Sequence, residues 1–213
     1  MIELYLRFPN IKKEFEEKVL EEIKKLYNKK IILITNKIKR RIQSRVLDLL
    51  KQSETYQEII RGGILVGEIG LQDQSAIDRI VNYIANNIVV EATDNSGGIG
   101  SISIAFIHNN YEDLFNLEDA VYYYTNAEGE TIQIDWLRWF ILYGSDIIVF
   151  DYDFFPLREG RTGLGIMRRS RMGWSLPPEH AGTPEDNFIT RALIDLDIEL
   201  DNIIRQEMTN GLQ

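Results

Sequence analysis

The chain of 213 residues contains no cysteine. This absence excludes disulfide bonds, thiolate-bound zinc and cysteine nucleophiles, so packing must stabilise the fold. The sequence also lacks an apolar run of about 18 residues, the minimum for a membrane-spanning helix. Its N-terminus lacks the basic start, apolar stretch and cleavage site of a signal peptide. We therefore expect a soluble protein made in the cytoplasm, without membrane contact.

Histidine is scarce as well, and the 2 residues of this type are His108 and His180. Neither has a partner at the spacing typical of metal ligands. No serine lies in the G-x-S-x-G setting of a nucleophile elbow. We therefore expect no catalytic residue, no metal site and no cofactor.

Asp151 and Asp153 provide an arrangement that would suit an enzyme. They alternate along the expected strand DIIVFDYDFF, and alternate residues of a strand share one face. Two carboxylates on one face can hold a cation or take part in hydrolysis. A metal-assisted hydrolase or nuclease is therefore one alternative function, although acids on an exposed strand more commonly increase solubility.

Charge is divided unevenly along the chain. Residues 1–62 carry 15 Lys and Arg against 9 Asp and Glu, a net charge of +6, so the total of −9 leaves −15 for residues 63–213. Between residues 28 and 51 only Asp48 opposes the basic side chains, which are Lys29, Lys30, Lys37, Lys39, Arg40, Arg41, Arg45 and Lys51. A nucleic-acid binding module that uses the basic helix 29–51 is a second alternative. The acidic remainder argues against it, because it repels phosphates.

Hydrophobic periodicity predicts a basic helical arm over residues 1–61. Apolar residues recur at steps of mostly three and four from Val19 to Leu49, which indicates one long helix or two helices broken near Asn28. The following segment, GGILVGEIGLQD, has glycines among its apolar residues and is predicted to be a turn-rich connection. A second amphipathic helix is expected over residues 77–88.

Residues 62–213 are predicted to form an α+β domain with a mostly antiparallel sheet. NIVVEATDNSGGIGSISIAFI and AVYYYTNAEGETIQI each contain two β-rich runs around a cluster of turn formers, which is typical of hairpins. IDWLRWFILYGS is expected to form a short buried helix that ends at Gly144, followed by a strand in DIIVFDYDFF. A packed C-terminal helix is expected after Thr183, its predicted N-cap.

The segment GRTGLGIMRRS, residues 160–170, has the glycine content of a phosphate-binding loop. Such loops bind phosphate at the start of a helix, but a double proline follows and excludes a useful helix before about residue 183. We expect instead a β-turn or bulge at residues 161–163 and an exposed hairpin that carries arginines. Trp174 is the expected aromatic anchor of this hairpin.

Three short motifs occur one after another within residues 62–205. An aromatic segment ends in Tyr143-Gly144-Ser145, a loop carries Thr162-Gly163, and the last helix opens with the segment NFITRAL, residues 187–193. In these motifs the chain resembles the tail-completion and neck proteins of tailed bacteriophages, which join the head to the tail.

This resemblance implies a non-enzymatic virion protein at the junction of neck and tail, made in the host cytoplasm. It implies a ring of identical subunits, a hexamer or a dodecamer, that contacts connector, neck and tail proteins while DNA passes only as cargo. From charge and exposure we expect the assembly interface to contain basic residues and one aromatic residue, namely Lys39, Arg40, Arg41, Arg45, Arg161, Arg168, Arg169, Arg171 and Trp174.

Overall fold

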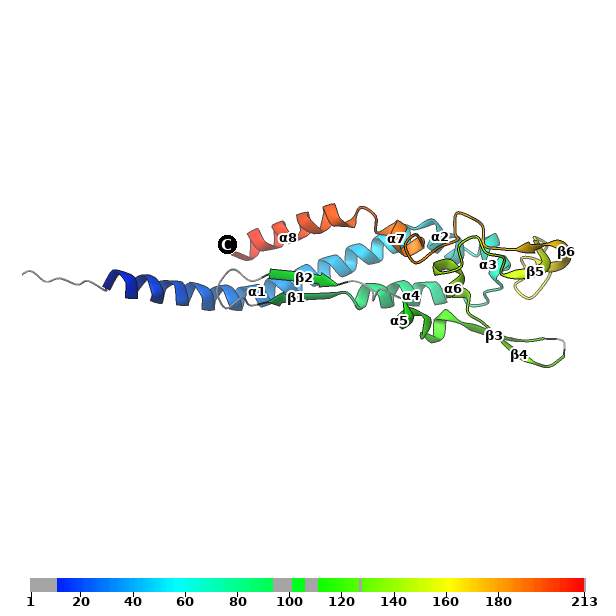
Figure 1. Ribbon diagram of the computed structural model, residues 1–213, viewed down its shortest axis with the longest axis horizontal. Helices are drawn as coiled ribbons and strands as arrows, with labels where there is room; N and C mark the ends of the chain where they lie inside the picture. Colours follow the sequence, from blue (N-terminus) through cyan, green and yellow to red (C-terminus); the bar gives the residue numbers. More distant parts are fainter. Residues whose placement is uncertain (1–10, 94–100, 106–110, 127, 213) are drawn as a thin grey trace, which may run out of the picture.

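The computed structural model describes residues 11–93, 101–105, 111–126 and 128–212, and its longest element is helix α1, Ile11–Gln52. The helix runs past Asn28 without a break. Its most deeply buried side chains recur at four-residue steps and therefore lie on one side; they are Ile34, Ile38, Ile42, Val46 and Leu50. The predicted stripe is wrong at its N-terminal end, because Val19 is exposed, whereas Leu49 at the other end is half-buried and packs against the core beside the fully buried Leu50. Figure 1 shows the reason at the N-terminal end, where the first turns of α1 extend beyond the other helices.

Three elements pack along the second half of α1 (Figure 1). They are helix α4, Ser75–Asn86, helix α8, Leu196–Leu212, and the hairpin of strands β1, Val89–Thr93, and β2, Ser101–Ala105. Helix α4 confirms the predicted amphipathic helix, since its buried residues include Ile77, Ile80, Val81 and Ile84. These elements and α1 share one continuous hydrophobic core.

The strands in the described residues form antiparallel hairpins, as expected, and the fold is α+β. Besides β1–β2, the pairs are β3, Tyr122–Thr125, with β4, Thr131–Ile134, and β5, Val149–Phe155, with β6, Ile166–Trp174. They remain separate two-stranded sheets and do not join into the single sheet that the sequence suggests. Helical segments between successive hairpins keep them apart. The predicted turn at residues 94–98 lies outside the described residues.

Short helices connect the longer elements. They are α2, Glu54–Ile60, α3, Ile64–Ile69, α5, Glu112–Phe115, the 3-10 helix η1, Glu118–Ala120, and α6, Trp136–Ile141. The expected buried helix is confirmed in α6, whose Trp136, Leu137, Phe140 and Ile141 are fully buried. Within the described residues, none of the helices combines the length and the apolar composition that a membrane crossing requires.

Helix α3 corrects the prediction of a turn-rich connection at residues 62–73. Its residues Leu65, Val66, Gly67 and Ile69 are buried, so burial against the rest of the fold overrides the low helix propensity of glycine. The helix ends at Gly70, whose φ of 69° lies in the left-handed region.

The C-terminal segment forms two helices where the sequence predicts one. Helix α7, Phe188–Ala192, begins after Asn187, whose Oδ1 accepts the backbone N–H groups of Ile189 and Thr190 at 3.0 and 3.2 Å. Thr190 Oγ1 accepts the N–H of Asn187 at 2.8 Å in return, which completes a capping box. The chain then turns at residues 193–195 before α8 begins.

Asn187 therefore takes the role predicted for Thr183. Asn187 is fully buried, and its Nδ2 also donates to Tyr111 Oη at 3.1 Å and to the Thr183 carbonyl at 2.9 Å. Thr183 Oγ1 accepts only the N–H of Asp186 within the described residues, at 3.2 Å, in the exposed turn before the helix. Asn187 thus caps α7 and also links this helix to Tyr111, the residue before α5.

We expect Asn187→Ala to lower the free energy of unfolding by about 2–3 kcal/mol, because it removes a cap and leaves buried polar groups without partners. Thr183→Ala is the matched control and should cost less than about 1 kcal/mol. Urea unfolding followed by circular dichroism measures both values. A larger loss in Thr183→Ala than in Asn187→Ala would contradict this assignment of the cap.

Candidate functional site at the hairpin end

A pocket of about 410 Å³ lies between α3 and the two hairpins β3–β4 and β5–β6. Its walls are largely aromatic, with side chains from both hairpins and from α6. These side chains are Tyr122, Tyr124, Trp139, Tyr152, Phe154 and Trp174. The pocket thus marks the place where the hairpins meet the body of the molecule.

Glycines allow α3 and the β5–β6 loop to approach closely beside this pocket. A Cβ atom at Gly67 would lie 2.7 Å from Cβ of Leu164, and one at Gly165 would lie 2.2 Å from Cζ of Phe154. The N–H of Gly163 donates to the carbonyl of Gly160 at 3.2 Å, which confirms the predicted turn. Several glycines of GRTGLG therefore serve chain packing and turn formation, and strand β6 follows them directly.

Arg161 joins the β5–β6 loop to the neighbouring hairpin. Its guanidinium carbon lies 4.3 Å from the ring centroid of Tyr124 and 5.4 Å from that of Tyr122, in cation–π contact. Tyr122 Oη donates in turn to the carbonyl of Ile69 at 2.6 Å. Arg161, expected in an assembly interface, thus makes contacts within its own chain.

Trp174, expected as an aromatic anchor in the assembly interface, is buried within its own chain. It is 6% exposed, and its ring packs edge-to-face on that of Trp139 at 5.7 Å between centroids. It is the last residue of β6, where the strand returns to the body and faces α6. Its role is to anchor the hairpin in its own subunit.

Glu68 on α3 is the ionisable residue of the pocket that sequence reasoning missed. Its Oε2 is buried and has no hydrogen-bond partner among the described residues. Burial raises the pKa of Glu68 to about 7, and the nearby carboxylates of Glu179 and Glu58 act in the same direction. A charged residue inside the apolar run ILVGEIG was the available signal.

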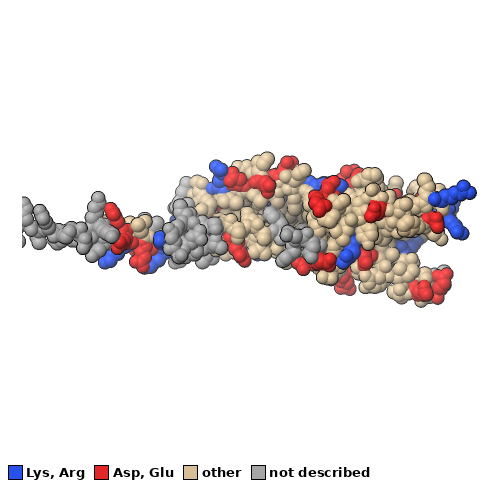
Figure 2. Space-filling model, in the orientation of Figure 1, with Lys and Arg blue, Asp and Glu red and all other residues tan. Residues whose placement is uncertain are grey.

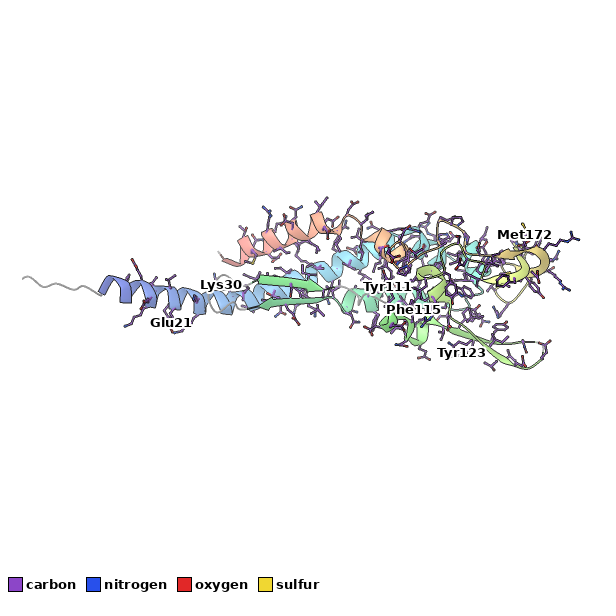
Figure 3. The ribbon with its side chains drawn as sticks, in the orientation of Figure 1. Glu21, Lys30, Tyr111, Phe115, Tyr123 and Met172 are labelled. Carbon is purple, nitrogen blue, oxygen red and sulfur yellow. The ribbon has the colours of Figure 1, made fainter. Side chains whose placement is uncertain are left out.

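The outer surface of the β5–β6 hairpin is basic and apolar. Arg168, Arg169 and Arg171 are exposed on β6, as expected. Phe150 and Met172 are 71% and 72% exposed beside them. Figure 3 shows that Met172 lies at the hairpin end of the molecule, away from the helical half.

The basic helix makes ion pairs with the C-terminal helix of the same chain. Arg41 Nη1 donates to Glu207 Oε1 at 2.7 Å, and Arg45 donates to both carboxylate oxygens of Glu199. These contacts hold α8 against α1 and engage two of the arginines predicted for assembly. Lys39 is half-buried and Arg40 is exposed.

Asp151 and Asp153 do not alternate regularly, contrary to the expectation. The pairing of β5 with β6 shifts between Phe150 and Tyr152, and Asp151 at this bulge has a left-handed φ of 60°. Asp153 lies opposite Arg168 in the register. Across the described ranges, no group of three His, Asp or Glu side chains is placed to hold a metal ion.

His180 has a structural position. It is buried, its Nδ1 lies 3.0 Å from Thr55 Oγ1, and burial lowers its pKa below the usual value. The neutral ring thus joins α2 to the segment before α7. His108 lies outside the described residues.

The first and third of the three sequence motifs lie near each other in the fold, although Tyr143 and Ser145 of the first are exposed. The N–H of Gly144, in the first motif, donates to the carbonyl of Gly182 at 2.8 Å. Phe188, in the third motif, packs edge-to-face on Phe140 at 6.5 Å. The Thr162-Gly163 motif lies apart from them, in the β5–β6 loop. Comparisons with protein-family models, curated proteins and solved structures gave no match for this chain.

We expect Glu68→Gln to raise the melting temperature more at about pH 8.5 than at about pH 5. The folded-state pKa of about 7 exceeds the ordinary 4.5, so the folded protein binds this proton more tightly than the unfolded chain. Stability from the protonated carboxyl is present at low pH and lost as the pH rises through about 7. Thermal melts of both proteins across this range measure the difference.

Glu185→Gln, at an exposed position, is the matched control and should leave the melting temperature nearly unchanged at both pH values. An equal shift at both pH values in Glu68→Gln would show that Glu68 is not the group responsible.

Proposed function

We propose that this protein is a structural component of the virion of a tailed bacteriophage, a subunit of the neck or tail-completion ring that joins head and tail. One observation carries the proposal, namely that two hairpins project from one end of a rod and expose charged and large apolar side chains (Figure 1). Isolated hairpins have unpaired edges, and apolar side chains exposed together are typical of interaction surfaces. Such an end is suited to contacts between subunits.

The motif positions support the same proposal. Phe188 of the third motif packs on Phe140 of the aromatic segment that leads into the first motif, so part of the likeness to phage neck proteins concerns residues that build the fold. A fold signature of this kind fits a protein whose task is assembly. The acidic net charge of −9 also suits a channel wall that passes DNA without holding it.

The alternative functions have weaker support. A hydrolase based on Asp151 and Asp153 would need both carboxylates on one face, whereas Asp151 lies at the bulge and Asp153 in the regular part of the strand. A nucleic-acid binding module would need the arginines of the basic helix, of which Arg41 and Arg45 are engaged by carboxylates of α8.

The proposal predicts that the purified protein, whose subunit mass is 24.8 kDa, forms closed rings of many subunits. Size exclusion with light scattering at low and high salt measures the mass, and negative-stain electron microscopy shows whether the assemblies close. A single-subunit mass at both salts, up to the highest soluble concentration, would contradict a self-assembling ring.

A further inference from the structure

The two hairpins at the end of the rod carry opposite charges. Residues 111–137, which include β3–β4, contain seven Asp and Glu and no Lys or Arg. Glu128 and Glu130 are exposed at the turn of this hairpin. Figure 2 shows basic side chains at the upper tip, where β5–β6 lies in Figure 1, and acidic side chains at the lower tip, where β3–β4 lies.

The charges of the two tips do not pair with each other in the described part of the chain. The ion pairs of the acidic segment are made nearer the body, by Asp119 with Arg79 and by Glu112 with Arg138. On the basic hairpin, Arg168 lies over the ring of Phe155 at 5.6 Å. Glu128, Arg169 and Arg171 thus stand in solvent on separate tips.

The acidic tip has a defined shape. Asn126 Oδ1 accepts the N–H of Glu130 at 2.8 Å, and Asn126 Nδ2 donates to Glu130 Oε2 at 3.0 Å. These bonds hold the two ends of the turn together. The segment 111–137 contains no Lys or Arg that could pair with the Glu128 carboxylate. A preformed acidic tip loses little conformational entropy when it binds.

Apolar surface lies next to the charges on both hairpins. Phe150 and Met172 are more than two-thirds exposed on β5–β6, and Tyr123 is 58% exposed on β3. Each hairpin is a two-stranded sheet with unpaired outer edges. Contact between two such hairpins would cover apolar side chains and place opposite charges together.

We propose that the β5–β6 hairpin of one copy, through Arg169 and Arg171, docks on the acidic β3–β4 hairpin of a second copy of this chain. The inference rests on the proposed function, because a contact between two different surfaces repeats around a ring when its rotation closes. The partner is a second copy because one molecule presents both halves of the complementary pair.

Charge reversal tests this contact, and the first variant is Arg169→Glu/Arg171→Glu. It leaves Arg168 unchanged, because Arg168 lies opposite Asp153 and its reversal would place like charges across the hairpin. The second variant is Glu128→Arg/Glu130→Arg, which loses the bond to the Glu130 carboxylate but keeps the two bonds between Asn126 and the Glu130 backbone. Thermal melts check that each variant remains folded.

Each variant alone presents two tips of like charge, so we expect single-subunit masses by light scattering. An equimolar mixture should restore assembly, since each reversed tip then meets a complementary tip and the two variants alternate. The control Lys18→Glu/Lys24→Glu makes the same change in net charge as Arg169→Glu/Arg171→Glu, at exposed positions at the far end of α1, and it should assemble like the wild type.

The outcomes separate this inference from the proposed function. Rings in either variant alone would overturn the hairpin contact and leave the ring proposal standing. Association that both variants lose and the mixture restores, but without closed rings, would keep the contact and contradict the neck ring. A wild type that never associates would overturn both.

Discussion

Burial of one stripe of α1 is the constraint on which the rest of the structure depends. Ile34, Ile38, Ile42, Val46 and Leu50 lose nearly all contact with water, and each such side chain contributes about 1.5–3 kcal/mol. Helices α4 and α8 and the β1–β2 hairpin pack along the same half of α1. Ion pairs of Arg41 and Arg45 with α8 determine which face of α8 packs against α1, because the paired carboxylates lie on that face. Among the described residues, these elements share one hydrophobic core with the rest of the fold.

The hairpins pack against the helical half at their bases, and their tips extend beyond it (Figure 1). Helices α3 and α6 are buried at its base, where Gly67 and Gly165 permit close contact and Trp174 is anchored beside Trp139. Arg161, in the β5–β6 loop, contacts the rings of Tyr122 and Tyr124 on β3 and so connects the two hairpins. The charged side chains at the tips lie on hairpins whose bases are packed. A binding site on a well-supported element favours a specific interface.

Local patterns predicted the elements well where one face is buried over a long run, as in α1, α4 and the hairpins. They failed where tertiary contacts decide. Glycines in α3 indicated a turn, yet burial of Leu65, Val66 and Ile69 makes a helix. Thr183 satisfied the local rule for an N-cap, but the buried contacts of Asn187 select the later start. At the site, exposure of the arginines on β6 followed from their place in an expected exposed hairpin, whereas the burial of Trp174 and the intramolecular partners of Arg41, Arg45 and Arg161 required the three-dimensional fold.

We propose that the hairpin end, and not the helical body, makes the contacts between subunits. Hydrogen–deuterium exchange of the free and the assembled protein measures this directly, because interface formation slows exchange of the amides that it covers. We expect slower exchange on assembly in β3–β4 and β5–β6, with exchange of the amides of residues 34–50 in α1 unchanged. Slower exchange along α1 and α8 with unchanged hairpins would contradict it.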